Sequence, residues 1–422
     1  MRRRGLIWRS DSRPAGMGSK VTGTKVLILG STFPRWQDDN QPQFVLDFAQ
    51  HLAQNHAVTV LAPYEKGSRI HERLGAVEVY RFPYAWPGTE KLAYRGGMVN
   101  TFRSSASAKV QLPLFLLGEL VFGLYLVAAK RIDVLNAHWL FPQGFVASAI
   151  KKISRRKLVI TTHGGDVEIL KRPEAKRLLE WPLKTADAVT FVSRRNLAMA
   201  DEHTTLPSDS WSVMPMGIDP PTNQPMGIDP PTNHQGRERS TMNVLFLGRL
   251  VEIKGVAYLI QGVAKANEEG LGCHLNILGD GPSRQQLTQL VADLHSTESI
   301  TFCGFIGGQS KDKYLADCDI VVIPSITDDQ GHEEGLPVTA LEAMAYGKVL
   351  IATRTGSMPE LLEGGGGILI EQKDARAICS AIKHIAASPD EAARIGEAAR
   401  RKAKDYDWTE IIRRFDLILD HI

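Results

Sequence analysis

The sequence predicts an α/β protein built from two doubly wound, Rossmann-like domains that face each other across a cleft. Short β-branched runs alternate with helical patterns in the first half, and the alternation starts again after residue 240. A segment rich in Pro and Gly separates the two series. Strands that alternate with helices indicate right-handed βαβ units and a parallel sheet. The length of 422 residues agrees with two domains.

The first domain is expected over residues 25–214. Its first strand, Lys25–Gly30, is a continuous apolar run that ends in glycine, which is typical of a strand buried on both faces. Phe44, Phe48 and Leu52 recur at four-residue spacing and predict a helix. Later strands are expected at Val58–Ala62, Val77–Arg81, Asp133–Asn136, Leu158–Thr162, Ala188–Val192 and Ser212–Met214.

The second domain is expected over residues 240–404, followed by a helix over 405–422 that packs back on the first domain. Ligands of open α/β sheets bind beyond the carboxyl ends of the strands, so the site is expected in the cleft between the domains. Strands are expected at Val244–Leu247, His274–Gly279, Ile300–Phe302, Ile320–Ile323, Val349–Ala352 and Ile368–Ile370.

The amino-terminal tail and the linker fall outside these domains. Residues 1–24 are basic and have no apolar core of a secretory signal, so they indicate a disordered tail, or an upstream start with Met17 as the true one. The linker, residues 215–239, contains Pro215–Asn223 and an identical copy at Pro225–Asn233. We interpret the repeat as a tandem duplication whose first copy is structural, and we expect the insertion to bulge out as a loop.

Composition and charge limit the class of protein. The composition is ordinary for a globular chain, which excludes collagen-like repeats and extended disorder. Four cysteines without a C-x-x-C pair favour reduced thiols in a cytoplasmic protein. The formal charge of +3 conceals an asymmetry: residues 1–234 carry 30 Lys and Arg against 20 Asp and Glu, and residues 235–422 carry 20 against 27. The two halves are therefore expected to meet different partners.

The most apolar stretch, Leu112–Ala129, lies in the basic half. It contains Pro113, Gly118 and Glu119, whereas crossing a bilayer takes about 20 apolar residues, so a transmembrane helix is not expected. Two alternatives remain, a helix packed into the domain and a helix lying in a membrane interface. Residues 91–195 carry 18 basic and 7 acidic side chains. This excess favours peripheral contact with an anionic membrane, with a solvated basic face as the alternative.

The densest chemical pattern is the block from Glu334 to Gly347, with Gly-Leu-Pro after the first carboxylate. A helix that begins near Pro337, with this proline as its first residue, would direct free N–H groups and its dipole at an anion such as a diphosphate. Glu342, about a turn inside that helix, could accept hydrogen bonds from ribose hydroxyls, and Glu334 from sugar hydroxyls. Two solvent-facing acids at a helix start are the alternative.

A second pattern, from Gly248 to Gly255, follows a predicted strand and contains Arg249 and Lys254. Two cations at a strand's carboxyl end suit phosphate binding. The block is no Walker loop, because G-x-x-x-x-G-K-[S/T] is absent. The turn Gly279–Pro282 follows the next strand, and simple turn chemistry explains it equally well.

These motifs together resemble the family 4 retaining glycosyltransferases of the GT-B fold. The resemblance runs from Lys25 over nearly the whole remaining chain, and its most specific part is the block Glu334–Gly347. Further matching segments are Asn136–Trp139, Pro142–Gly144, Thr162–Asp166, Ala186–Ser193, Pro215–Asp219, Gly248–Gly255, Leu278–Pro282, Tyr314–Ser325 and Ile351–Glu360.

The resemblance implies roles on the donor side. Arg249 and Lys254 would neutralise the diphosphate of the leaving group, and Glu342 would hold the ribose. Glu334 would bind the transferred sugar. Further donor contacts are implied for Gly248, Gly279, Gly335, Leu336 and Pro337.

On the acceptor side, the resemblance implies that His163 reaches the sugar from the opposing domain. His138, Trp139 and Asp166 are weaker candidates for the acceptor pocket. Two departures stand out: the loop Ser31–Gln41 lacks the glycine pair common in the family, and Ser357 follows Gly356 where a second glycine is common.

The implied reaction moves a sugar with retention of anomeric configuration from a UDP- or GDP-sugar, with no metal, no other cofactor and no protein nucleophile. The expected acceptor is a saccharide or a lipid-linked saccharide in exopolysaccharide or glycolipid synthesis, at the cytoplasmic face of the membrane. No nucleic acid partner is expected. Asp317-Cys-Asp319 has the form of a metal-binding D-x-D, but its place before a strand indicates a structural turn. The alternatives are a nucleotide-sugar epimerase and a non-catalytic nucleotide-sugar-binding protein.

Overall fold

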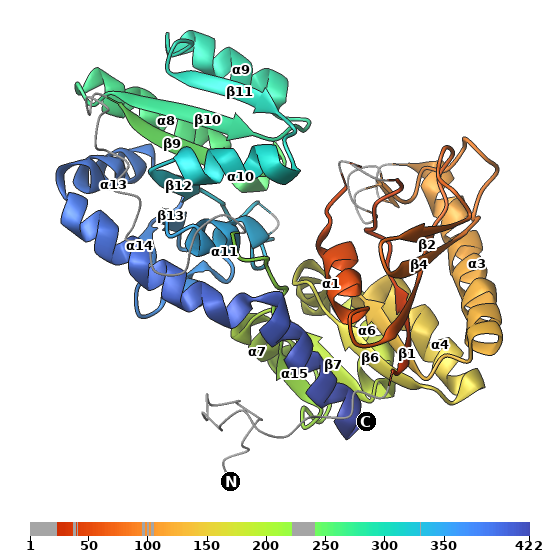
Figure 1. Cartoon of the computed structure of the whole chain (residues 1–422). Helices are drawn as coiled ribbons and strands as arrows, with labels where there is room; N and C mark the ends of the chain where they lie inside the picture. Colours follow the sequence, from red (N-terminus) through yellow and green to blue (C-terminus); the bar gives the residue numbers. More distant parts are fainter. Residues whose placement is uncertain are drawn as a thin grey trace. The chain divides into compact units, whose positions relative to one another are not determined.

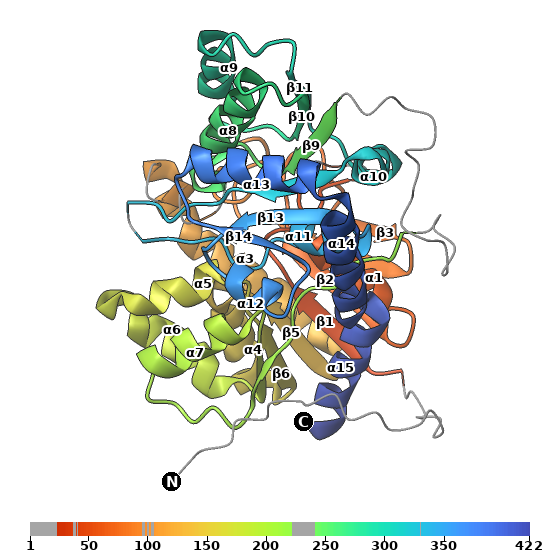
Figure 2. The same cartoon turned by 90° about the vertical axis from the view of Figure 1, so that its left-hand side faces the viewer.

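A computed structural model describes residues 23–36, 39, 41–94, 98, 101–102, 105–221, 241–329 and 331–422. The chain forms two compact units (Figures 1 and 2): unit 1 runs to Met216 and includes Ile411–Ile422, and unit 2 is Gly217–Glu410. The amino-terminal tail, apart from its last two residues, lies outside the described residues. So does the second nonapeptide copy, and with it the expected bulge. The first copy is described to residue 221.

Unit 1 contains an eight-stranded sheet in the order β3-β4-β2-β1-β5-β6-β7-β8. All neighbours are parallel except β3, which runs antiparallel to β4 at the sheet edge. Strand β3 was not predicted from the sequence, and each of the other strands agrees with a predicted run to within two residues at either end. The strands are β1 Lys25–Leu29, β2 Ala57–Pro63, β3 His71–Leu74, β4 Val77–Phe82, β5 Val134–His138, β6 Lys157–Thr161, β7 Ala188–Phe191 and β8 Trp211–Val213.

Helices cover both faces of this sheet (Figure 1). The helices of unit 1 are α1 Phe44–Leu52, α3 Ala106–Lys130, α4 Phe145–Ser154, α5 Gly165–Glu168, α6 Pro173–Thr185 and α7 Arg194–His203. Helix α3 packs on β1, β2 and β4 and lies beside α4. Leu27 and Leu29 of β1 belong to the same apolar cluster as Phe115 of α3.

The carboxy-terminal helix, α15 (Trp408–His421), follows a 3-10 turn at Lys404–Tyr406, so it begins three residues later than expected. Its last part belongs to unit 1. Phe415 meets Phe48 of α1 edge-on at 5.1 Å. The carboxylate of Asp416 lies 2.9 Å from Nε2 of His56. These contacts fasten the chain end to the first unit.

Helix α3 contains the apolar stretch singled out in the sequence, and it is long and apolar enough to cross a membrane by length and composition. Ser105 caps its start by accepting the N–H of Ala108 at 3.4 Å. Its inner face is buried against the sheet, and Gly118 and Gly123 allow close contact with the Pro83 carbonyl and with Ile150 of α4. The helix is therefore packed into the domain on one side, which was one of the two expected alternatives.

The buried face of α3 contains one ionisable group, Glu119, whose side chain is fully buried. Its Oε1 accepts a hydrogen bond from Nε2 of Gln143 at 3.4 Å, while Oε2 has no partner among the described residues. Burial raises the pKa of Glu119 to about 8, because a desolvated carboxylate without a cation is costly. Glu119 is therefore protonated at neutral pH.

Unit 2 contains a six-stranded, wholly parallel sheet in the order β11-β10-β9-β12-β13-β14. This is the doubly wound order of a Rossmann fold, with its switch point between β9 and β12. The strands are β9 Met242–Leu247, β10 Cys273–Leu278, β11 Ile300–Gly304, β12 Ile320–Ile323, β13 Val349–Thr353 and β14 Gly367–Ile370. Each agrees with its predicted run to within two residues at either end.

The helices of unit 2 connect these strands on both faces (Figure 2). They are α8 Val256–Glu268, α9 Arg284–Asp293, α10 Gly308–Asp317, α11 Val338–Ala345, α12 Met358–Leu362, α13 Ala375–Ala387 and α14 Pro389–Ala403. Two apolar clusters fill the two sides, one with Val244 and Phe246 of β9 and the other with Leu245 and Leu247. All four cysteines are free thiols, three of them buried.

We predict that Glu119→Gln makes the protein more stable than wild type at alkaline pH. Because the pKa is about 8 in the folded protein and near 4.5 when unfolded, the unfolded chain loses its proton first. Wild-type stability therefore falls as pH rises between these values, by up to roughly 1.4 kcal/mol per pH unit. Glutamine keeps the shape and has no proton to lose.

The measurement is chemical unfolding of both proteins at pH values on either side of neutrality. The stability difference is expected to widen towards alkaline pH and to vanish near the acidic end. A difference that does not change with pH would contradict the protonated assignment.

Candidate functional site

The switch point of unit 2 brings together loops that are far apart in sequence. The loop after β9 begins at Gly248, whose N–H bonds the Leu278 carbonyl at the end of β10 at 3.0 Å. Gly279 has φ +148°, and a Cβ there would overlap the carbonyl oxygen of Gly248. Gly255 likewise lies against the Pro324 carbonyl that follows β12. Glycine is therefore required for the three strand ends to approach this closely.

Lys254 and Glu334 meet at this edge. Nζ of Lys254 forms an ion pair with Oε1 of Glu334, and the hydroxyl of Ser325 donates to Oε2 at 2.5 Å. The two charged side chains retain 18% and 17% of their exposure, so the pair is accessible to a ligand. The sequence predicted both charged residues as site candidates, and the structure places them in direct contact. Ser325, two residues after β12, was not among the predicted site residues.

Arg249 lies in the same loop and is exposed. Its side chain has no ion pair with any residue in the described part of the chain. An exposed guanidinium in the loop that also holds Lys254 provides charge and five N–H donors for an anion. The loop therefore presents both predicted cations at the switch point.

The segment Glu334–Pro337 leads into α11. The helix begins at Val338 and Pro337 occupies the N-cap position, so the proline is not the first helical residue, as expected, but the one before it. The first-turn amides of α11 still face the loop that contains Glu334. Glu333 braces this loop, because its carboxylate accepts Thr327 Oγ1 and the N–H of Gly356, both at 3.0 Å.

Glu342 is separated from Glu334 by the first turn of α11. Its Oε1 accepts a hydrogen bond from Nζ of Lys311 of α10 at 2.5 Å, and the two side chains are 28% and 19% exposed. Glu342 was predicted as a site residue from the sequence, and Lys311 was not. The signal that could have found it is weak, because Lys311 lies in a polar, exposed helix without a motif.

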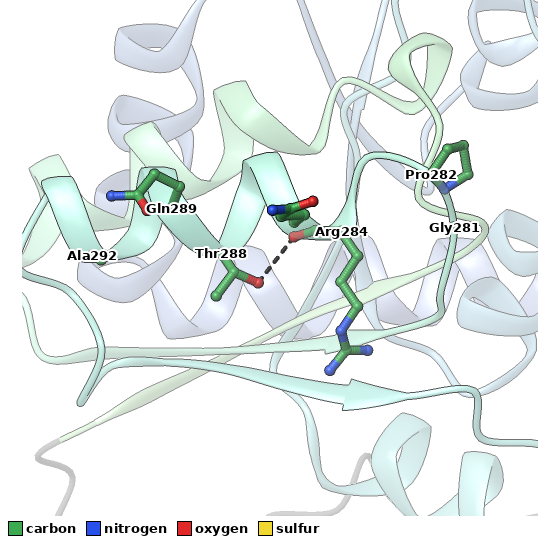
Figure 3. A pocket seen from close by; sticks show the side chains of 7 residues that line it. Gly281, Pro282, Arg284, Thr288, Gln289 and Ala292 are labelled. Atoms are coloured by element: carbon green, nitrogen blue, oxygen red, sulfur yellow. Dashed lines mark hydrogen bonds between the residues drawn. The ribbon is translucent and has the colours of Figure 1, made fainter.

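A surface groove of about 560 Å³ runs along α9, outside the switch point. Figure 3 shows its lining side chains along one face of the helix, with the Thr288 hydroxyl bonded to the Arg284 carbonyl at 2.9 Å. The groove includes Gly281 and Pro282 of the predicted turn but neither cation of the β9 loop. Its polar lining consists of two glutamine amides, the Thr288 hydroxyl and the Arg284 guanidinium, and it contains none of the charged residues of the switch point.

In unit 1 the corresponding switch point lies between β1 and β5, and two histidines meet there. His138 ends β5 and His163 follows β6; Nδ1 of His138 lies 2.9 Å from Nε2 of His163. Their ring planes are nearly parallel, at 17°. His163 also contacts Trp139 at 4.5 Å and Phe44 at 5.0 Å between ring centroids. Burial lowers the pKa of His138 to about 3 and that of His163 well below its usual value, so both imidazoles are neutral.

The hydrogen bond fixes the positions of the protons. Nε2 of His138 is buried without a partner among the described residues. A proton there would be an orphaned buried N–H, which proteins tolerate less than an orphaned acceptor. The proton of His138 therefore belongs on Nδ1, where it donates to Nε2 of His163. His163 then bears its own proton on Nδ1 and is a hydrogen-bond donor at that atom.

Two of the other acceptor candidates, His138 and Asp166, are buried. His138 is fully buried, so it lies behind His163 and cannot contact an acceptor directly. Asp166 is 5% exposed and accepts N–H groups of His163, Gly164 and Val167 at 3.0 to 3.1 Å and of Leu140 at 2.9 Å. It fastens the two loops together, and both of its oxygens are occupied. Trp139 is half-buried against His163.

Two further expectations concern loops. The carboxylate of Asp319 accepts the N–H of Asn243 at 2.8 Å, which ties the start of β12 to the start of β9, as a structural turn requires. In the loop after β1, Arg35 forms an ion pair with Asp39 at 2.7 Å and with Glu65 at 2.9 Å. This pairing, in place of a glycine pair, orders the described part of that loop.

Comparison with known proteins identifies the chain. The sequence model "Glycosyl transferases group 1" matches residues 234–402, and the model "Glycosyltransferase Family 4" matches residues 41–221. The chain belongs to the family 4, group 1 glycosyltransferases. It is 27% identical, over 91% of its length and 95% of the relative, to a GDP-mannose-dependent alpha-(1-6)-phosphatidylinositol monomannoside mannosyltransferase of Mycolicibacterium smegmatis. It is also 27% identical to the putative colanic acid biosynthesis glycosyltransferase WcaL of Escherichia coli, over 67% of this chain and 69% of that one.

Solved structures share the fold of this glycosyltransferase. Sucrose-phosphate synthase from Thermosynechococcus elongatus matches with a TM-score of 0.74 at 19% identity, over 94% of this chain and 98% of that one. Anabaena HepE in complex with UDP-glucose matches with a TM-score of 0.67 at 20% identity, over 94% and 100%. The fold is therefore the two-domain α/β fold of GT-B glycosyltransferases, as predicted.

We predict that His138→Leu lets the proton of His163 move away from Nδ1, because Nε2 no longer accepts a hydrogen bond. The sugar-transfer activity of the enzyme should fall by about tenfold, the loss expected for one buried hydrogen bond. His138→Asn keeps an amide donor near the position of Nδ1 and should restore most of the activity. Nitrogen NMR of labelled histidine checks the assignment, because the two neutral tautomers differ in their ring shifts. A wild-type His163 protonated at Nε2 would contradict it.

Proposed function

We propose that this glycosyltransferase moves a sugar with retention of configuration from a UDP- or GDP-sugar to a saccharide or lipid-linked acceptor, without a metal ion or other cofactor. The observation that carries the proposal is the set at the switch point of unit 2, where Arg249, Lys254 and the start of α11 present positive charge beside Glu334.

Departure of a nucleoside diphosphate leaves negative charge on the phosphates. Preorganised cations stabilise that charge in the transition state more than in the bound donor, and this difference accelerates the reaction. Arg249 can bind two phosphate oxygens through its planar fork, while Lys254 acts as a point charge. The first-turn amides of α11 add the positive end of a helix dipole. Together these groups do what a divalent cation does in metal-dependent transferases.

Glu334 suits a sugar-binding role better than that of a nucleophile. One of its oxygens bonds Lys254 and the other bonds Ser325. A carboxylate held in this way is a weak nucleophile and a well-oriented acceptor for sugar hydroxyls. Retention without a protein nucleophile is consistent with that assignment. We assign the ribose to Glu342, which would exchange its bond with Lys311 for hydroxyl groups, and we keep for His163 the contact with the transferred sugar that the family resemblance implies.

Similarity to relatives supports a proposal for the acceptor. The two relatives named above are described as acting on a phosphatidylinositol mannoside and in colanic acid biosynthesis. We propose a saccharide or glycolipid acceptor, used at the cytoplasmic face of the membrane, where nucleotide sugars are available. The basic excess over residues 91–195 supports contact of the enzyme with that surface.

We predict that Lys254→Ala and Arg249→Ala each lower kcat by about 10²–10³-fold, the usual cost of removing one preorganised group that stabilises transition-state charge. Lys265→Ala is the matched control, because this exposed lysine of α8 also pairs with a carboxylate, that of Glu269 at 3.6 Å. The control should keep wild-type kcat. Unfolding temperatures of all variants should remain close to wild type, and wild-type turnover in Lys254→Ala would refute the phosphate role.

We predict that one class of nucleotide sugar stabilises the protein against heat in a panel of UDP-, GDP- and ADP-sugars. A ligand at a hundred times its Kd stabilises the folded state by about 2.7 kcal/mol. Lys254→Ala should lose most of that shift. NMR of the product then tests retention through its anomeric signals.

Failure of every donor to shift unfolding would count against the donor site. Conversion of the donor in the absence of any acceptor would instead favour an epimerase. An inverted product would reject the retaining assignment and leave the transfer itself intact.

A further inference from the structure

The outer face of α3 exposes a continuous stripe of large apolar side chains. Its members recur at helical spacing on the side opposite the sheet, and they are 50% to 71% exposed: Val110, Leu114, Leu117, Val121 and Tyr125. At about 1.5 Å per residue the stripe is roughly 22 Å long. No side chain in the described ranges covers it, and contiguous exposed apolar surface of this size marks an interaction site.

The inner face of the same helix is committed to the domain. Phe115 and Glu119 are fully buried, and Phe115 packs edge-on against Phe82 of β4 at 4.8 Å. A helix that forms one layer of an α/β unit cannot also cross a bilayer, because its buried face and the attached sheet would have to enter the lipid. Helix α3 is therefore apolar on two sides: the inner side packs on the sheet and the outer side is exposed.

Cations flank the stripe at both ends. Lys109 is exposed at the start of α3 and Arg131 at its end. Helices α3 and α4 both connect parallel strands of one sheet, so their carboxyl ends lie at the same edge, where Lys152 and Arg155 are also exposed. None of these four cations has an ion pair with a described residue. Ile153, 63% exposed, lies among them.

One member of the stripe is aromatic. Tyr125, near the end of α3, is 63% exposed. Tyrosine prefers the level of lipid headgroups, where its apolar ring and its polar O–H are both satisfied. Tyr125 therefore gives the stripe one residue suited to a membrane interface.

We propose that the outer face of α3 is a membrane-docking surface that lies in the plane of an anionic bilayer. The apolar stripe enters the acyl boundary while Lys109, Arg131, Lys152 and Arg155 bind lipid phosphates. An amphipathic helix with cations beside its apolar face has the composition of interfacial helices. Unit 1, whose strand ends supply His163 and Trp139, would thereby be held at the membrane.

The charges favour a bilayer over a second copy of the chain as the occupant. Both ends of α3 are cationic, so a partner α3 would bring like charges together in parallel and in antiparallel pairing. An anionic surface satisfies both ends at once. The inference deepens the proposed use of a lipid-linked acceptor, but vesicle binding is measured without donor or acceptor. A failure of the protein to bind vesicles would therefore not count against the proposed sugar transfer.

The test is co-sedimentation of the full chain with vesicles of phosphatidylcholine alone and of phosphatidylcholine mixed with phosphatidylglycerol. Wild type is expected to bind the mixed vesicles, and to bind them more weakly at high salt because the ionic part is screened. Leu117→Gln/Val121→Gln should weaken binding at least tenfold, since two side chains then lose apolar transfer. Phe305→Gln is the matched control, because Phe305 of unit 2 is as exposed as Leu117, at 56%.

A second variant gives a signal that rises with insertion. Tyr125→Trp places an indole on the stripe, and brominated lipids should quench it beyond the quenching seen in wild type. The double variant should keep its circular dichroism and its unfolding temperature, because both side chains are exposed.

Three outcomes would overturn the proposal: equal vesicle binding by wild type and the double variant, no binding by wild type to either vesicle, and dimers of wild type that the double variant abolishes without any vesicle binding. The last would assign the stripe to a second copy. Binding to phosphatidylcholine alone as strong as to the mixed vesicles would overturn the role of the cations.

Discussion

The parallel order of the strands is the constraint on which the site depends. In unit 2 all six strands point the same way, so their carboxyl ends share one edge, and the order reverses between β9 and β12. The chain must leave these two strands in opposite directions, which opens a space that only their loops can line. Lys254 and Glu334, 80 residues apart, meet there, and Ser325, two residues after β12, lies beside them. The strand order therefore brings these charged side chains together, and their contact depends on it.

Much of this arrangement could be predicted from the sequence, because buried parallel strands are continuous β-branched runs. Ile320–Ile323 was predicted to the residue. Strand β3 was missed because His-Glu-Arg-Leu is polar, as an exposed edge strand is allowed to be. The glycine-rich blocks with Arg249, Lys254 and Glu334 were found because motif and strand end coincide in sequence. Lys311 was not, because its partner Glu342 is close only after α10 and α11 pack.

The roles of buried polar groups were harder to predict than their presence. His138 and Asp166 were both proposed as acceptor contacts, since each follows or ends a strand at the right edge. Their burial decides otherwise: His138 supports His163, and Asp166 joins two loops through four backbone N–H groups. Sequence spacing can place a residue at a strand end, but it does not show whether the side chain is exposed to a ligand or buried beneath a neighbouring side chain.

The charged and titratable groups at the two switch points differ in burial. In unit 1 the groups at the switch point are desolvated, so the histidine pair is neutral and acts through fixed hydrogen bonds. The fully buried guanidinium of Arg81 pairs with Glu72 at 2.5 Å and donates to the carbonyls of Arg69 and Pro34 at 2.9 Å. In unit 2 the cations at the switch point keep access to water, and a solvated cation can exchange water for phosphate at little cost. Under the proposed function, binding and release of a diphosphate need that access, whereas a sugar hydroxyl is better oriented by a neutral, immobile donor. The near-neutral total charge of the chain is the sum of a basic first half and an acidic second half, and the proposed function gives their charges different roles.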